Sequence, residues 1–144
     1  MSDSVTLSHG SVAQLLERFR ELRIVVVGDV MLDEYFLGSV ERASPEAPVP
    51  VVKMGAESRG LGGAANVASV AAAFGSTVRL LGLVGDDAAG DRFLDECKAA
   101  GIDATDVVKV ADRPTTRKLR ILAQHQQVVR LDWEDTRPVD ESVG

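Results

Sequence analysis

Cysteine and aromatic residues are scarce in this chain of 144 residues, and each scarcity excludes a class of protein. The single cysteine, Cys97, can form neither an intramolecular disulfide nor a zinc site built from several cysteines. It falls within a helical pattern, which favours a structural thiol. Aromatic residues make up only 4% of a sequence that is 45% hydrophobic. The core must therefore consist of Val, Leu, Ile and Ala, which is typical of buried parallel strands beneath helices rich in small residues.

An excess of basic residues and long apolar runs are also lacking. The chain has 16 lysines and arginines against 22 aspartates and glutamates, a net charge of −6, which excludes a nucleic-acid backbone as the main partner. A small anionic ligand is still allowed, because it needs only a few local cations. No run approaches the roughly 18 apolar residues that span a membrane, and residues 1–4 do not begin a signal peptide. We expect a cytoplasmic protein without a membrane partner.

Hydrophobic periodicity predicts alternating helices and strands. A helix is expected from about Ser11, followed by a buried parallel strand over residues 23–27 that ends at Gly28 and Asp29. Further along, Asp87 is placed to cap a helix. The same patterns predict helices over residues 64–74 and 88–100 and strands over residues 77–84 and 107–110.

Two segments depart from this alternation. Prolines exclude a helix or a central strand over residues 39–50, so this stretch is expected to run outside the main sheet, with residues 51–54 pairing at an edge. Residues 115–134 alternate between apolar and polar on either side of Gln124-His125-Gln126. They predict an antiparallel hairpin that has Leu119 on one face and solvated side chains on the other.

Together these elements predict an α/β fold, a doubly wound and mostly parallel sheet with a small β lid. The core is expected over residues 11–33 and 60–110, and the lid over about 34–55 and 114–134. No helix or strand is predicted after the hairpin, so we interpret the chain as the N-terminal portion of a larger domain, truncated before its remaining part. Such a part-built sheet is expected to expose apolar side chains.

Two groups of residues are candidates for contact with a small ligand. Asp29 and Asp33 follow the first strand, and ligands of open α/β sheets bind beyond the carboxyl ends of the strands. The alternative is that Asp29 caps a turn and Asp33 is a surface residue. Gly62 and Gly63 precede a helix whose first N–H groups are free, and Asn66 lies in its first turn with donor and acceptor atoms. The same glycines can instead serve only helix–sheet packing.

The glycine segment also imitates a dinucleotide-binding fingerprint. Gly60, Gly62 and Ala65 fit G-x-G-x-x-A, and Asp86 follows about 20 residues later. The fingerprint should follow a buried strand directly, whereas here residues 55–59 and a proline-rich stretch precede it. A nicotinamide cofactor is therefore not predicted, and no G-x-x-x-x-G-K-[ST] loop indicates another nucleotide site.

The predicted hairpin carries three cations, Lys118, Arg120 and Arg130. On alternating strands they can converge on an anion. The alternative is ordinary solvated charge, paired across the strands with Asp132 or Glu134. No metal site is predicted, because the chain's two histidines stand apart from its cysteine and from each other.

Two runs, GGAANVA at residues 62–68 and LGLVGDDAAG at 81–90, resemble the first signature of the ribokinase-like (PfkB) carbohydrate kinases. The resemblance covers about residues 24–134. Within that family the chain is most similar to the D-glycero-β-D-manno-heptose-7-phosphate kinases, including the kinase domain of the bifunctional ADP-heptose synthesis protein. The stretches that carry this likeness are GDVMLD at 28–33, SPEAPVPVV at 44–52, TRKLR at 116–120 and QQVVRLD at 126–132. Arg59-Gly60-Leu61 stands where many relatives have a proline before the glycine pair.

The resemblance implies a role for each candidate. Asp33 matches the family's sugar-binding aspartate, and Gly62, Gly63 and Asn66 match its glycine-asparagine motif that contacts the sugar. The proline-rich excursion and the hairpin match the family's β lid, which covers the sugar and often joins two subunits, so a homodimer through the lid is implied. The lid cations implied to lie near a sugar phosphate are Lys118, Arg120 and Arg130.

The family's activity is transfer of the ATP γ-phosphoryl group to a sugar hydroxyl, which here implies phosphorylation of D-glycero-D-manno-heptose 7-phosphate at C1 for lipopolysaccharide synthesis. ATP and Mg²⁺ are the cofactors implied for the full-length enzyme. The family's catalytic base lies in a Gly-Ala-Gly-Asp motif that this sequence lacks, so no catalytic residue or metal ligand is assigned and these residues alone are expected to be inactive. The alternatives are another ribokinase-like sugar or nucleoside kinase, or a non-catalytic sugar-binding or dimerisation fragment.

Overall fold

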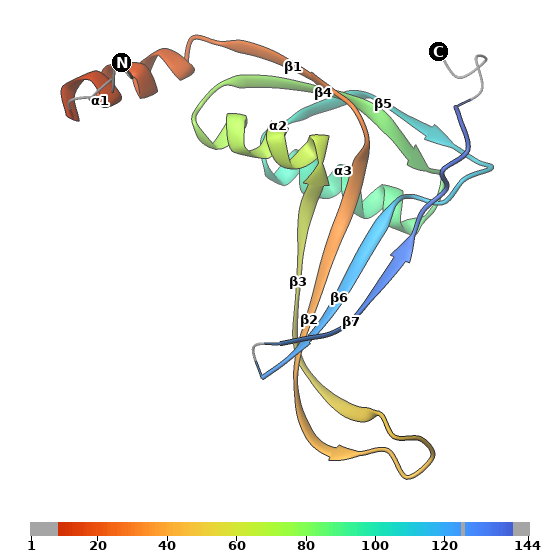
Figure 1. Ribbon diagram of the computed structural model, residues 1–144. Coiled ribbons are helices and arrows are strands. Elements are labelled where there is room, and N and C mark those ends of the chain that lie inside the picture. The colour runs from red at the N-terminus through yellow and green to blue at the C-terminus, as the bar shows by residue number, and fades with distance from the viewer. Residues whose placement is uncertain (1–8, 125, 140–144) are drawn as a thin grey trace, which may run out of the picture.

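The computed structural model describes residues 9–124 and 126–139, which form two sheets (Figure 1). One sheet is parallel, in the order β1-β4-β5, and the other has the order β3-β2-β6-β7. The described elements are α1 His9–Phe19, β1 Arg23–Val27, β2 Val30–Ala43, β3 Pro50–Gly63, α2 Ala64–Ala73, β4 Thr77–Gly85, α3 Ala88–Ala99, β5 Asp103–Val110, β6 Arg117–Ala123 and β7 Gln126–Trp133. The predicted α/β class is confirmed. None of the described helices is long and apolar enough to cross a membrane.

The hydrophobic core lies between the parallel sheet and helices α2 and α3. Val78 and Leu80 of β4 are almost fully buried and belong to one cluster with Ala68 of α2 and Phe93 of α3. The small side chains of α2 let it lie close to the sheet, as the composition predicted. The opposite face of the sheet is open: Val25 and Val27 are 62% and 70% exposed. The described residues therefore cover one face of the parallel sheet only, which agrees with the expected exposure of apolar side chains.

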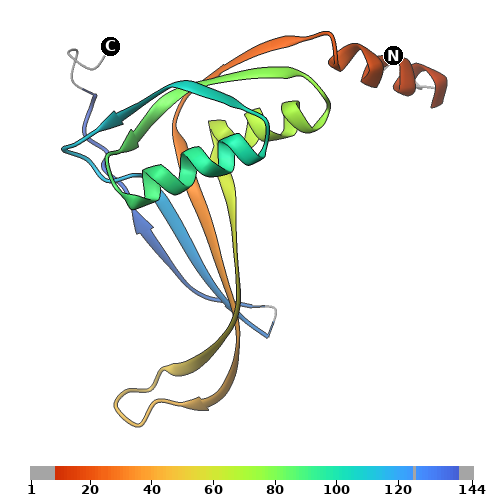
Figure 2. The same cartoon turned by 180° about the vertical axis from the view of Figure 1, so that it is seen from behind.

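The second sheet forms the lid. β2 pairs antiparallel with β3 and parallel with β6, and β6 pairs antiparallel with β7. Its strands leave the helix-covered layer and extend downward in Figure 1, and the β2–β3 hairpin reaches beyond the lower ends of β6 and β7 in both views (Figures 1 and 2). The predicted hairpin over residues 115–134 is confirmed, and so is the edge pairing of residues 51–54, because β3 is an edge strand. His125, in the predicted turn, lies outside the described residues.

Gly62 and Gly63 precede a helix, as predicted, but the segment Gly60–Gly63 reaches that helix as a strand. These residues are the end of β3 and pair with Val30–Asp33 of β2. Only Gly63 has a positive φ, +59°, and there the chain passes directly from strand into α2. Asp33 and Gly62, which the sequence assigned to the core, therefore lie on strands of the lid sheet. Ser11 likewise lies within α1 instead of starting it.

A buried hydrogen-bonded cluster joins the lid to the core. Asp87 caps α3, as predicted, by accepting hydrogen bonds from the N–H groups of Ala89 and Gly90. Thr115, which is 1% exposed and precedes β6, donates its N–H and its hydroxyl to Asp87 at 3.0 and 2.7 Å. The Thr115 hydroxyl also accepts from the N–H of Gly85 at 2.9 Å. The start of β6 is thereby fixed to the carboxyl end of β4 and the first turn of α3.

Candidate functional site

One face of the lid sheet collects most of the predicted site residues. Residues that pair across neighbouring strands point to the same side of a sheet. The register pairs Asp33 with Lys118 and Lys118 with Asp132, and it pairs Arg120 with Arg130. We call the side that carries these side chains and the Tyr35 ring the acid–cation face. The alternation of residues 117–123 is as predicted, with Leu119 buried on the other side.

Asp33 is held by an arginine from the neighbouring strand. Arg120 Nη1 donates a hydrogen bond to Asp33 Oδ1 at 2.5 Å, and the two side chains are 22% and 19% exposed. The Arg120 guanidinium also lies over the ring of Tyr35, with its Cζ 5.2 Å from the ring centroid. The hydrogen bond to Asp33 raises the pKa of Arg120, which therefore stays charged. The carboxylate is fixed in place and keeps lone pairs free for hydroxyl donors.

Gly62 and Gly63 allow this close packing. A Cβ atom on Gly62 would come within 2.5 Å of Asp33 Oδ2 and 2.6 Å of Met31 Cγ, so the carboxylate lies directly against the β3 backbone. A Cβ on Gly63 would collide with the carbonyl oxygen of Asp29, which accepts a hydrogen bond from the N–H of Ala64 at 2.8 Å. Asp29 thus supports the strand-to-helix passage through its backbone, while the residue itself is exposed.

The remaining cations are paired with carboxylates. Lys118 Nζ lies 3.2 Å from Asp132 Oδ2 and 3.3 Å from Glu134 Oε2. Arg130 donates two hydrogen bonds of 2.9 Å to the two carboxylate oxygens of Asp132, and these bonds lower the pKa of Asp132. Lys118 is therefore paired across the strands, as one alternative held, whereas Arg130 is paired within β7, and convergence of the cations on an anion stays a prediction. An anionic ligand would have to compete with Asp132.

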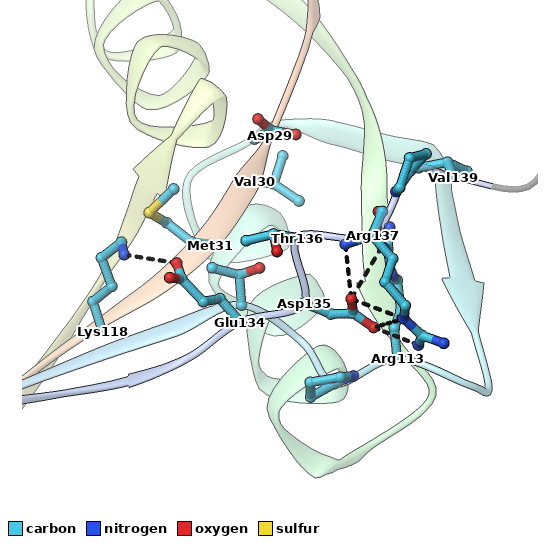
Figure 3. A pocket seen from close by; sticks show the side chains of 13 residues that line it. Asp29, Val30, Met31, Arg113, Lys118, Glu134, Asp135, Thr136, Arg137 and Val139 are labelled. Atoms are coloured by element: carbon cyan, nitrogen blue, oxygen red, sulfur yellow. Dashed lines mark hydrogen bonds and ion pairs between the residues drawn. The ribbon is translucent and has the colours of Figure 1, made fainter.

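A cavity of about 480 Å³ lies where the lid strands leave the core (Figure 3). Asp29, Met31 and Lys118 line one side of it, and Figure 3 shows Lys118 and Glu134 pointing toward each other there. Asn66, in the first turn of α2, is exposed and is not among the residues that line this cavity. The structure thus brings Asp29 and Lys118 to one cavity, and a sugar contact by Asn66 stays a prediction.

The opposite side of the cavity is built by residues that the sequence reasoning missed. Arg137 donates hydrogen bonds to Asp135 and to the carbonyl oxygen of Asp112, and Arg113 donates to the carbonyl oxygen of Arg137 at 2.7 Å. The hydrogen bonds from Arg137 lower the pKa of Asp135 to about 2. Both arginines precede a proline, which favours an extended backbone. Two Arg-Pro pairs beside the hairpin were the signal that could have found them.

The donor set does not fit a metal ion. Among residues 9–124 and 126–139, no group of three or more His, Cys, Asp or Glu side chains could hold one. The cations of the acid–cation face are engaged by carboxylates, and Arg113 and Arg137 of the cavity donate to carbonyl oxygens. We therefore assign neither Mg²⁺ nor ATP to these residues and derive no step through either.

Comparison with known proteins finds sugar kinases. The chain is 49% identical over 118 residues to D-beta-D-heptose 7-phosphate kinase of Bordetella bronchiseptica, a match that covers 82% of this chain and 37% of that protein. It is 48% identical over 120 residues to the bifunctional protein HldE of Pseudomonas syringae pv. tomato, which covers 83% of this chain and 25% of that protein. The chain spans between about a quarter and somewhat over a third of the length of these relatives.

Solved structures agree on the fold. A carbohydrate kinase from Agrobacterium tumefaciens superposes with a TM-score of 0.61 at 24% identity, covering 76% of this chain and 34% of that one. Ribokinase from Cryptococcus neoformans var. grubii serotype A in complex with ADP gives 0.56 at 24% identity, covering 84% and 38%. At such identities the likeness concerns the fold alone. Residues 21–142 match the pattern of the pfkB family carbohydrate kinases, and the chain belongs to that family.

Proposed function

We propose that this chain supplies the sugar-binding part of a kinase that phosphorylates D-glycero-D-manno-heptose 7-phosphate at C1, a step toward ADP-heptose and lipopolysaccharide. The observation that carries the proposal is the acid–cation face, where Arg120 holds the Asp33 carboxylate and where Lys118 also lines the cavity. A sugar phosphate needs both kinds of group: an acceptor for its hydroxyls and cations for its phosphate. The 49% identity to a protein named for this substrate supports the choice of sugar.

In this proposal different residues bind the hydroxyl groups and the phosphate group of the ligand. Asp33, fixed by Arg120 and by the bare backbone of Gly62, accepts hydrogen bonds from sugar hydroxyls. Lys118 and Arg130 turn from Asp132 to the phosphate group, which offers more oxygen acceptors than the carboxylate does. Gly63 and Asn66 belong to the same sugar-contacting segment. A lid that excludes water over the bound sugar strengthens these electrostatic contacts.

We propose that the phosphoryl donor binds to the part of the kinase that these 144 residues do not include. We propose that the complete enzyme uses ATP and Mg²⁺ in the cytoplasm, and that residues 1–144 by themselves transfer no phosphoryl group, because a Gly-Ala-Gly-Asp motif is absent from this sequence. Measurable ATP-dependent phosphorylation of heptose 7-phosphate by the purified 144-residue chain would contradict this part of the proposal.

We also propose that two lids associate into a homodimer. β7 is an edge strand of the lid sheet, and its Val129 and Leu131 are 40% and 43% exposed. A second copy of the strand would pair with the free edge and cover these side chains. Analytical ultracentrifugation of the chain should show a dimer that Leu131→Lys converts to a monomer, and a monomeric parent chain would end this proposal.

Calorimetric titration of the chain with heptose 7-phosphate tests the ligand. We expect binding that Asp33→Asn and Lys118→Met each weaken by about tenfold, since hydrogen bonds to charged groups contribute about 1.5–3 kcal/mol. Lys53→Met is the matched control, because Lys53 is an exposed lysine of β3 far along the hairpin from Asp33. Unphosphorylated heptose should bind weakly and respond to Asp33→Asn but not to Lys118→Met. Equal affinities of Asp33→Asn, Lys118→Met and Lys53→Met for heptose 7-phosphate would refute the proposed binding site. Tighter binding of a fructose phosphate or a nucleoside would refute the proposed substrate.

A further inference from the structure

On the side of the lid sheet opposite the acid–cation face, four side chains, one from each strand, contact one another in a row. Arg59 of β3 has its Nε 3.7 Å from Glu34 Oε1 of β2. Arg117 of β6 donates two hydrogen bonds to Glu34 Oε2, at 2.9 and 2.6 Å. The guanidinium of Arg117 lies over the ring of Trp133 of β7, 4.5 Å from the centroid. We call these four residues the Glu34 row.

Glu34 is the centre of the row and is only 4% exposed. Burying an ionised carboxylate is costly, and apolar side chains of similar size would stabilise a sheet as well or better. A buried ion pair instead distinguishes one arrangement of strands from its alternatives, because a displaced register leaves the charges without partners. The Glu34 row is therefore better suited to specifying how the strands align than to stabilising the lid.

The Thr115 cluster fixes the start of β6 to β4 and α3, but none of its side-chain hydrogen bonds is to β2, so the alignment of β2 with β6 depends on other contacts. The two strands pair in parallel, and Glu34 and Arg117 are 83 positions apart in the chain, so no tight turn sets their register. A shift by one residue would move every side chain of β6 to the opposite face. A shift by two would keep the faces but move Arg120 about 7 Å away from Asp33.

We propose that Glu34, Arg117 and their neighbours Arg59 and Trp133 are positioning residues, which hold β2 and β6 in the register that brings Arg120 and Lys118 to Asp33. Glu34 is adjacent to Asp33 in the chain, and Arg117 is adjacent to Lys118. Because neighbouring residues of a strand point to opposite faces, the row fixes the ligand-binding side chains without touching a ligand. The effect on a ligand rests on the proposed function, whereas the effect on the register does not.

Replacement of the pair by apolar residues separates positioning from stability. The double variant Glu34→Leu/Arg117→Leu removes both charges together, and Arg59 keeps its 2.9 Å bond to Glu57. We expect the double variant to unfold at the same or a higher urea concentration than the parent, yet to bind heptose 7-phosphate about tenfold more weakly, because small displacements of binding groups are costly. The single variant Arg117→Lys keeps the charge and should retain part of the affinity.

Arg79→Met is the matched control. Arg79 also joins paired strands by ion pairs, to Asp103 and Asp106, but in the parallel core sheet. It should leave the affinity unchanged. The positioning role is overturned if the double variant binds within about twofold of the parent, or if Arg79→Met weakens binding as much as the double variant does.

Two readouts do not need the ligand. Trp133 is the chain's single tryptophan, so its fluorescence reports on the lid alone, and Arg117→Lys should leave its emission closer to the parent's than Arg117→Met does. Amide hydrogen exchange in β6 should become faster in the double variant while exchange in β4 is unchanged. If the parent binds no phosphosugar, the proposed function fails, and unchanged protection of β6 would then still overturn the positioning role by itself.

Discussion

Alanine at Gly62 tests whether the candidate site depends on the close approach of Asp33 to β3. The added Cβ would stand 2.5 Å from Asp33 Oδ2 and 2.6 Å from Met31 Cγ, about 1 Å inside an ordinary van der Waals contact. The carboxylate cannot move freely, because its other oxygen accepts the 2.5 Å hydrogen bond from Arg120. Overpacking of this kind costs about 1–3 kcal/mol. A displacement of about 1 Å in a binding group can also lower a site's performance by up to about a hundredfold.

Gly60→Ala provides the matched comparison. Gly60 lies on the same strand two residues earlier, pairs with Asp33, and has nothing within 4 Å of an added Cβ. Neither glycine has a positive φ, so both variants gain the same roughly 0.4–1 kcal/mol from a less flexible unfolded chain. Gly60→Ala should therefore be neutral or slightly stabilising, and Gly62→Ala should be about 1–3 kcal/mol less stable than Gly60→Ala.

Urea unfolding monitored by circular dichroism measures the difference in stability, and calorimetry with heptose 7-phosphate measures the difference in affinity. We expect Gly62→Ala to bind about ten- to a hundredfold more weakly than Gly60→Ala. Equal unfolding free energies for the two variants would show that Asp33 does not pack on β3 as described. Equal affinities with unequal stabilities would show that the position of Asp33 is irrelevant to the ligand.

Three further predictions concern charges and thiols. Burial raises the pKa of Asp87, but hydrogen bonds from Thr115 and the first turn of α3 lower this pKa to below its ordinary value, so the stability it contributes is present above about pH 4 and is lost as the pH falls further. Asp87→Ala should lower the unfolding free energy at pH 7 by about 1–2 kcal/mol and flatten its decline between about pH 5 and 2, as urea titrations at several pH values would show. Asp132→Asn should weaken the hold of Asp132 on Lys118 and Arg130 and tighten heptose 7-phosphate binding in calorimetry, whereas weaker binding would mean that Asp132 itself holds the ligand. Burial raises the pKa of the Cys97 thiol to about 11, so iodoacetamide at about pH 8 should label it only after denaturation, and rapid labelling of the folded chain would contradict this.

Local patterns predicted much of the fold because they are set by near neighbours. The alternation around Lys118 and Leu119 correctly gave the two faces of β6, since side chains of a strand alternate whatever it pairs with. The cap at Asp87 was predictable for the same reason, because its partners are two and three residues away. Asp33 and Gly62 could be named as candidates from their motifs, and the structure brings them into direct contact.

The errors arose where distant pairing overrides local preference. The segment Gly60–Gly63 has little intrinsic preference for a strand, and its extended backbone depends on pairing with Val30–Asp33 of β2. The hydrogen bond from Arg113 to Arg137 joins residues 24 positions apart, and no periodicity links them. Neither the strand pairing nor this hydrogen bond produces a pattern within a short stretch of sequence. The boundaries of the lid and the far wall of the cavity could therefore not be predicted.

The same distinction explains why the acid–cation face was predicted only in part. Alternation determines which residues of β2 share a face and which residues of β6 do, but it does not determine how far one strand slides along the other. Asp33 could face Lys118, Arg120 or Leu122 without any change in local pattern, and in the observed register it lies opposite Lys118 and is bonded by Arg120. The choice is made on the reverse side of the sheet, where Glu34 finds partners on both flanking strands in this register. A ligand-binding face built on paired strands therefore depends on residues that no ligand-binding motif would identify.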